Sequence, residues 1–149
     1  KDYLNQMNQN YIDIANNTIE IGKRLILAKS LVKHGQWQSW LQNNFQLSQS
    51  AANKFMSVAE RFANSESIPI LKTTQMIALL SLPDAEETEK FIEAKAAEGK
   101  KVADMTIKQL REEIDEQVVS FIWRLMTGGH DDGRGALVTN SKRYRMRRI

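Results

Sequence analysis

Polar side chains along one face of a predicted helix, residues 48–62, are the best candidates for chemistry in this chain. The outward positions hold Gln49, Ser50, Asn53, Lys54 and Ser57. Asn and Gln amides can pair bidentately with adenine in the major groove of DNA, and Ser hydroxyls can bond several bases. Lys54 and Arg61 have the chemistry to contact phosphates. These residue types predict a DNA-reading helix, and a solvated polar face is the alternative.

This helix needs a partner element to position it, and residues 37–62 match part of the helix-turn-helix pattern. Ser48 predicts the start of the second helix, because its hydroxyl can accept from a free amide of the first turn. The apolar positions around the turn and in the second helix are filled by Phe45, Leu47, Ala52 and Phe55. Gln46 stands where Gly is usual, and Gln42 where Ala is usual. A tri-helical core without DNA contact would use the same apolar pattern.

A long helix is predicted ahead of this unit, over residues 2–33. Apolar side chains follow steps of three and four from Leu4 through Ile14 to Val32, which is a heptad seam. Ile12, Ile19 and Ile26 add a second row beside it. The wide apolar face predicts that the helix packs on the domain's own core or forms a homodimer with a second copy. Both are compatible if one apolar row packs on the core and the other row contacts the second copy. Trp37, Trp40 and Leu41 then have the spacing of a buried face, although an exposed Trp could stack on a base.

Basic residues concentrate at the other end of the chain. Residues 121–149 contain seven Lys or Arg and two Asp, whereas residues 1–120 contain 14 Lys or Arg and 16 Asp or Glu. The cluster, with Tyr144 interleaved, consists of Lys142, Arg143, Arg145, Arg147 and Arg148. It can neutralise phosphates of DNA. A solvated terminus and a segment that docks on an acidic protein surface are the alternatives.

Few residues could support catalysis. The chain has no Cys and two His, so nucleophiles and thiolate metal sites have few or no candidates. His130, Asp131 and Asp132 lie in a Gly-rich stretch, where a solvated turn is the better interpretation than a metal site. No phosphate-binding loop and no dinucleotide fingerprint occur. We therefore expect no catalytic residues, no metal and no cofactor, and a protein that is not an enzyme.

The remaining pattern predicts an all-α protein. Residues 1–127 form a helical domain, with the helix-turn-helix at about 36–62 and short helices after it. Residues 128–149 form a separate Gly-rich and basic segment, with four of the seven glycines. No apolar run approaches the roughly 18 residues of a membrane span, and no signal peptide is visible. We expect a cytoplasmic protein without membrane contact.

Several phrases resemble an uncharacterised family of helical proteins carried by phages and by integrative or conjugative elements of Gram-positive bacteria. They are IGKRLILAKSLVKHGQWQSWL, LSQSAANKFMSVAERF, MIALLSLPDAEETEKFI and DMTIKQLREEI, and they fall within residues 19–114. The unit is also similar, more distantly, to the DNA-binding part of plasmid partition proteins. The resemblance implies mobile-element biology and DNA binding, and it supplies no reaction. The segment from Gly128 lies outside it.

Two functions from different classes follow from these observations. The first is sequence-specific binding of double-stranded DNA in the regulation of a phage or mobile element. The second is a phage-borne inhibitor or adaptor, of the anti-CRISPR or anti-defence type, which binds a host or rival-element protein. In that case the helix-turn-helix would be a packing unit or an autoregulator. We favour the first function. The nearly neutral body and the distinct C-terminal segment are the observations that support the second.

Overall fold

The computed structural model describes residues 1–65 and 71–128, and this part of the chain is helical without strands. Its elements are α1 (Asp2–Leu31), α2 (Trp37–Phe45), α3 (Gln49–Phe62), α4 (Thr73–Leu79), α5 (Ala85–Ala97), the short 3-10 helix η1 (Val102–Asp104) and α6 (Ile107–Thr127). The predicted all-α class and the long N-terminal helix are confirmed. That helix ends at Leu31, two residues before the predicted end.

Local signals in the sequence fix where several helices begin and end. The amide of Ala51 donates to Ser48 Oγ over 3.1 Å, which confirms the predicted start of α3. Thr106 and Gln109 form a capping box at the start of α6, with each side chain bonded to the other residue's amide. These bonds satisfy amides that the first turn of a helix leaves without partners. Gly128 ends α6 with a positive φ of 69°, a conformation that glycine adopts without steric cost.

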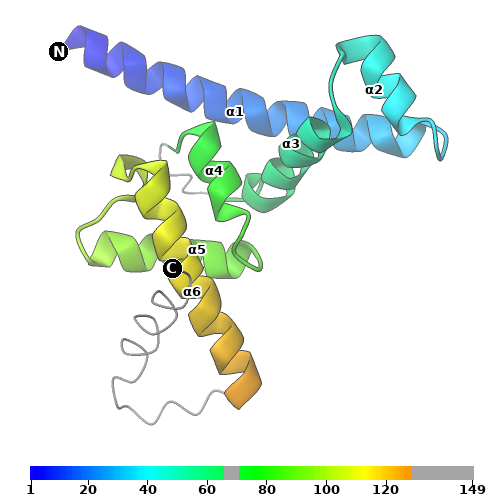
Figure 1. Cartoon of the computed structure of the whole chain (residues 1–149). Helices are drawn as coiled ribbons and strands as arrows, with labels where there is room; N and C mark the ends of the chain where they lie inside the picture. Colours follow the sequence, from blue (N-terminus) through cyan, green and yellow to red (C-terminus); the bar gives the residue numbers. More distant parts are fainter. Residues whose placement is uncertain (66–70, 129–149) are drawn as a thin grey trace.

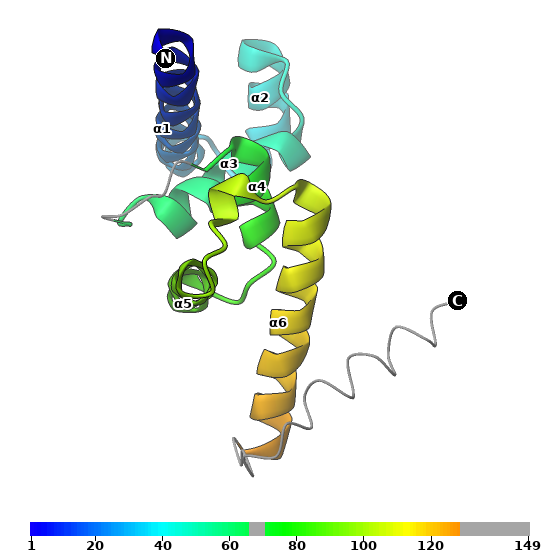
Figure 2. The same cartoon turned by 90° about the vertical axis from the view of Figure 1, so that its left-hand side faces the viewer.

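Two apolar clusters hold the helices together. The larger cluster joins α1, α3, α4, α5 and α6, with Val58, Leu71, Met76, Leu79 and Leu110 among its fully buried members. The smaller cluster joins α2 to α1 and α3, and consists of Leu25, Trp37, Leu41, Ala52 and Met56. Helix α3 therefore contributes to both. Figures 1 and 2 show α3 against α1, with α2 at one end of this pair and α4, α5 and α6 on the other side.

Gly22 allows α1 and α3 to approach closely. A Cβ atom at this position would lie 2.1 Å from the carbonyl oxygen of Phe55 and 2.6 Å from Cβ of Ala59. Both distances are far below van der Waals contact, and the nearer atom belongs to backbone, which no rotamer change can move. The angle and separation of α1 and α3 therefore depend on a glycine in the middle of a helix.

The long apolar face of α1 is divided between the core and the surface. Thr18, Ile19 and Leu25 are buried against the other helices, which confirms that α1 packs on its own domain. Met7 and Ile14 are exposed by 53% and 50%. The N-terminal half of α1 extends beyond the rest of the molecule, as Figure 1 shows.

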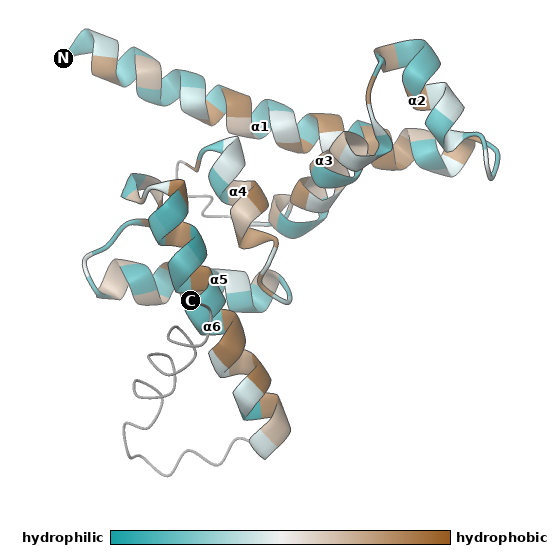
Figure 3. Ribbon diagram, viewed as in Figure 1, coloured by the Kyte–Doolittle hydropathy of each residue, from teal (hydrophilic) through white to brown (hydrophobic). Residues whose placement is uncertain are grey.

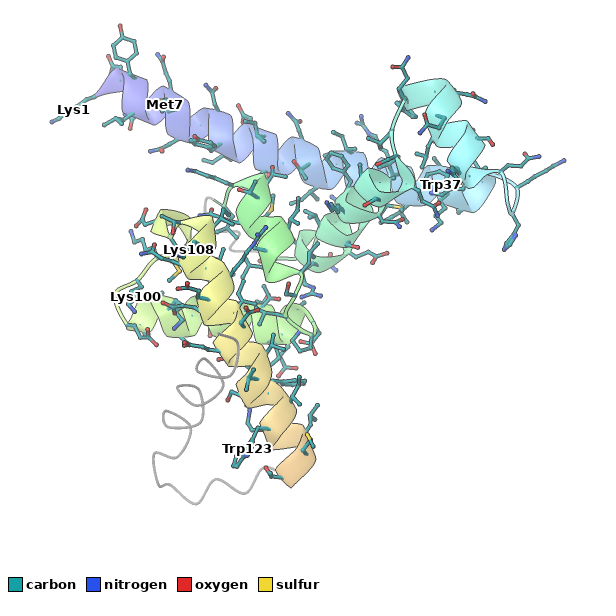
Figure 4. The ribbon with its side chains drawn as sticks, viewed as in Figure 1. Lys1, Met7, Trp37, Lys100, Lys108 and Trp123 are labelled. Atoms are coloured by element: carbon teal, nitrogen blue, oxygen red, sulfur yellow. The ribbon has the colours of Figure 1, made fainter. Side chains whose placement is uncertain are left out.

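The C-terminal end of α6 is a second exposed apolar surface. Its exposed side chains are Val119, Ile122, Trp123, Leu125 and Met126. Figure 3 shows this hydrophobic end projecting from the body, and Figure 4 places Trp123 on it. Exposed apolar surface of this kind is typical of contact sites with another macromolecule.

Candidate nucleic-acid interface

Helices α2 and α3 are joined by a short turn, residues 46–48, that contains one left-handed residue. Gln46, at the position where Gly is usual, has a φ of 51° and is left-handed. Its amide donates to the Gln42 carbonyl at 3.2 Å, and the Gln42 side-chain amide donates to the Leu47 carbonyl at 3.4 Å. The turn thus keeps its left-handed residue without the glycine that would adopt it freely.

The apolar pattern of the unit is confirmed in part. Ala52 is fully buried, and Leu47 and Phe55 are half-buried against α1 and α2. Phe45 precedes the turn as predicted, but its side chain is 61% exposed and lies outside the core, with its ring centroid 5.5 Å from that of Trp40. The side chain of α2 that is fully buried is Leu41.

The tryptophans of α2 are structural. Trp37 is buried in the smaller cluster (Figure 4) and stacks on Trp40, with ring centroids 5.4 Å apart. Lys29 lies over the Trp37 ring, with Nζ 6.0 Å from the ring centroid. The indole nitrogen of Trp37 is buried without a hydrogen-bond partner among the described residues. Packing therefore positions these rings, as the spacing predicted, and Trp37 is not accessible to a base.

The predicted reading residues share the solvent-facing arc of α3. Gln49, Ser50, Asn53 and Lys54 are exposed, and Ser57 is half-buried. The opposite face, with Ala52, Met56, Ala59 and Phe62, is buried. Because Gln49 and Ser50 lie in the first turn of α3, their side chains stand at the end that recognition helices usually direct toward bases. Glu60 is also exposed, on the C-terminal part of the same helix.

Arg61 has an intramolecular role that the sequence did not indicate. One guanidinium nitrogen donates to the carbonyls of Leu82 and Asp84, at 2.8 and 3.2 Å, and to Thr88 Oγ1 at 3.0 Å. Burial lowers the pKa of Arg61, and the charge of Asp84 partly offsets this effect. The side chain ties the end of α3 to the start of α5. We therefore replace its predicted phosphate contact with this structural role.

The local charge around α3 differs from that of the rest of the body. Residues 21–59 contain Lys23, Arg24, Lys29, Lys33 and Lys54 and no Asp or Glu. All five cations are exposed, and Lys23 pairs with Glu20 at 3.0 Å. Residues 73–127 contain 11 Asp or Glu and seven Lys or Arg. We call residues 21–62 the helix-turn-helix lobe. The positive charge of this lobe does not appear in the net charge of residues 1–120, because acidic residues elsewhere offset it.

Two grooves flank the outward arc of α3. The first lies between α1 and α3 and includes Lys29, Asn53, Ser57 and Glu60 in its walls. The second lies between α3 and the start of α5, and its walls include Arg61, Asp84 and Ala85. Lys29 and Glu60 line the first groove, whereas Arg61, Glu60 and Asp84 line the second. The Arg61 guanidinium already donates to the Leu82 and Asp84 carbonyls, but the Lys29 ammonium forms no ion pair with the described residues. An anionic partner of α3 is therefore better accommodated on the α1 side.

The other candidate residues lie outside the described part of the chain. They are Lys142, Arg143, Arg145, Arg147, Arg148, His130, Asp131 and Asp132. Within the described residues, no group of three or more His, Asp or Glu side chains could hold a metal ion. The described helices also include none with the length and apolar character needed to cross a membrane.

Comparison with known proteins places most of this structure in one family. The model of the family described as "Protein of unknown function (DUF3102)" matches residues 3–117. The match covers α1 to α5 and the first half of α6, including the complete helix-turn-helix lobe. No curated protein and no solved structure matched the chain significantly.

Proposed function

For a chain that belongs to the DUF3102 family of proteins of unknown function, we propose sequence-specific binding of double-stranded DNA. The observation that carries the proposal is the outward arc of α3. The amides of Gln49 and Asn53 and the hydroxyl of Ser50 are exposed on this arc. They belong to the helix-turn-helix lobe, in which residues 21–59 contain no Asp or Glu. Amide side chains in the major groove read adenine bidentately, and nearby cations contact phosphates.

We assign fewer residues of α3 to the bases than the sequence suggested. Gln49, Ser50 and Asn53 are the proposed reading set, since they are exposed and near the start of α3. Lys54, which is also exposed, is kept for a phosphate contact, and the half-buried Ser57 is left out of the reading set. Glu60 and Asp84 place negative charge toward the other end of α3, where a phosphate backbone would be repelled. We expect the duplex to contact the N-terminal half of α3.

The biological role belongs to the same proposal. The resemblance to proteins of phages and conjugative elements supports regulation of transcription in such an element, within the cytoplasm of a bacterial host. The basic cluster from Lys142 to Arg148 would add salt-dependent affinity by neutralising phosphates. We propose no catalytic role for any residue.

A double substitution tests the reading set. Changing Gln49 and Asn53 to Ala should remove about 2–6 kcal/mol of preference for a cognate site, because each bidentate contact is worth about 1–3 kcal/mol. The fold should persist, since both side chains are exposed. The matched control changes Gln6 and Asn16, which are exposed on the N-terminal half of α1. Mobility-shift titrations that give the double variant and the control the same preference as the wild type would refute the assignment.

A homodimer through α1 would bring two reading helices to one site. Exposed Met7 and Ile14 lie on the part of α1 that extends from the body. Heptad spacing of such residues suits a second copy of the helix. Dimeric helix-turn-helix proteins read two half-sites related by symmetry. We therefore propose a dimer that recognises a palindromic sequence.

A protein-binding inhibitor or adaptor is the second candidate, and the end of α6 favours it. Ile122, Leu125 and Met126 are exposed there, beyond residue 117, where the family match ends. A partner protein could cover this apolar surface. Recovery of a stable stoichiometric partner in the absence of DNA, lost when Leu125 and Met126 are both changed to Glu, would support this function over that of a repressor.

A further inference from the structure

A groove between the C-terminal half of α1 and the outward arc of α3 has the chemistry of an anion site. Its volume is about 550 Å³. Its walls are formed by Ile26, Lys29 and Ser30 from α1, and by Asn53, Met56, Ser57 and Glu60 from α3. Lys29 and Asn53 thus face a common space, although they are 24 positions apart in the sequence.

Hydrogen-bond donors that are not used within the described chain line this groove. The side chains of Lys29, Asn53 and Ser57 form no hydrogen bond or ion pair with the described residues, and Lys29 Nζ lies 6.0 Å from the Trp37 ring centroid. Ser30 is different, because its hydroxyl donates to the Leu27 carbonyl at 2.6 Å. The Lys29 ammonium and the Ser57 hydroxyl therefore remain to bind an anion in the groove, and the Asn53 amide remains to bind a base.

The negative charge in the groove limits where that anion can lie. Glu60 is the carboxylate among the residues that line it. It follows Asn53 by about two turns of α3. Gly22 of α1 lies against Phe55 and Ala59, and Leu25 shares a cluster with Ala52 and Met56. Lys29, further along α1, therefore lies toward the Asn53 end of the groove. A phosphate would therefore be attracted at the Lys29 and Asn53 end and repelled at the Glu60 end.

We infer that this groove seats the phosphate backbone of one DNA strand, with Lys29 contacting a phosphate. The inference rests on the proposed DNA binding by α3, and it adds a contact from a different helix. It assigns Lys29 to backbone positioning and leaves base reading to Gln49 and Asn53. The backbone contact fixes the distance of α3 from the major groove, which is how phosphate contacts usually set register.

Two substitutions with opposite expected effects test the inference. The full chain is titrated with a fluorescent mixed-sequence duplex of about three helical turns, from about 50 to 200 mM KCl. Lys29→Ala should weaken binding about threefold to tenfold at low salt and reduce the slope of log K against log salt by about one. Glu60→Gln should tighten binding at low salt, a gain that misfolding cannot produce. Lys108→Ala is the matched control, since Lys108 is an exposed lysine on α6 (Figure 4).

The possible outcomes distinguish a failure of the groove assignment from a failure of the proposed DNA binding. A reduced slope for Lys29→Ala, tighter binding for Glu60→Gln and an unchanged Lys108→Ala would support the groove as the phosphate site. If the wild type binds the duplex and Lys29→Ala titrates like Lys108→Ala, the groove assignment is overturned while DNA binding stands. If the wild type binds no duplex at the lowest salt, both proposals are wrong. Far-ultraviolet circular dichroism confirms that each variant is folded.

Discussion

The substitution Gly22→Ala tests whether α1 and α3 depend on backbone contact. An alanine in the middle of a helix ordinarily adds about 1 kcal/mol to the free energy of unfolding relative to glycine. Here its Cβ would lie 2.1 Å from the Phe55 carbonyl oxygen and 2.6 Å from Cβ of Ala59. The two helices must move apart by more than 1 Å to restore a contact of about 3.5 Å.

The cost of that movement exceeds the gain in helix propensity. Insertion of a methyl group into a well-packed core typically costs about 1–3 kcal/mol, and more where backbone blocks it. The separation would also loosen contacts of buried Ile19, Leu25, Val58 and Ala59, which lie near the crossing. Because backbone blocks the methyl group, we take the upper part of this range, about 2–3 kcal/mol, and subtract the gain of about 1 kcal/mol in helix propensity. We therefore expect Gly22→Ala to lower the free energy of unfolding by about 1–2 kcal/mol and the melting temperature by roughly 3–6 °C.

Urea and thermal unfolding, followed by far-ultraviolet circular dichroism, measure this effect. The control is Asn17→Ala, at an exposed position of the same helix, which should be neutral or slightly stabilising because alanine is the better helix former. If Gly22→Ala unfolds at the same or a higher temperature than the wild type, the close crossing of α1 and α3 is incorrect. The position of the outward arc of α3 beside Lys29 would then be incorrect as well.

Two further predictions concern the turn and the oligomeric state. Gln46→Gly should raise the free energy of unfolding by about 1 kcal/mol, because glycine adopts a φ of 51° without the steric cost that glutamine has there. Urea unfolding measures this change. An unchanged or lower free energy of unfolding would contradict the left-handed turn. The proposed dimer should appear by light scattering, and Ile14→Glu should convert it to a monomer, whereas Asn16→Glu should not. A wild type that stays monomeric at high concentration would rule out a homodimer through α1.

Features encoded by neighbouring residues could be predicted from the sequence. Ser48 begins α3, and Thr106 with Gln109 begins α6, because a cap depends on residues one turn away. The shared outward arc of α3 followed from helical periodicity alone. The all-α class followed in the same way from the long apolar seam of α1.

Features that depend on distant contacts could not be predicted in this way. Arg61 has the residue type of a phosphate contact, and only the fold brings it to the Leu82 and Asp84 carbonyls. Gln75 similarly donates to the carbonyls of Val102, Ala103 and Met105, which tie η1 and the start of α6 to α4. Periodicity also could not decide which rows of α1 are buried, because that depends on where α3 crosses.

Two further features are visible in the sequence only when short segments are considered separately. A glycine inside a strongly helical pattern, as at Gly22, indicates close packing with a neighbour. The absence of carboxylates from residues 21–59 was likewise available in the sequence. The net charge of residues 1–120 does not reveal this positive region, because acidic residues of α5 and α6 offset the cations of residues 21–59.

Binding-site selection from random duplex DNA would show whether α3 reads sequence. The full chain is used at about 100 mM KCl, since affinity for DNA depends strongly on salt. We expect convergence on one sequence motif, palindromic if the dimer forms, and loss of that convergence in the Gln49→Ala, Asn53→Ala double variant. Retention of duplexes without a common motif, or of none, would contradict sequence-specific reading by α3.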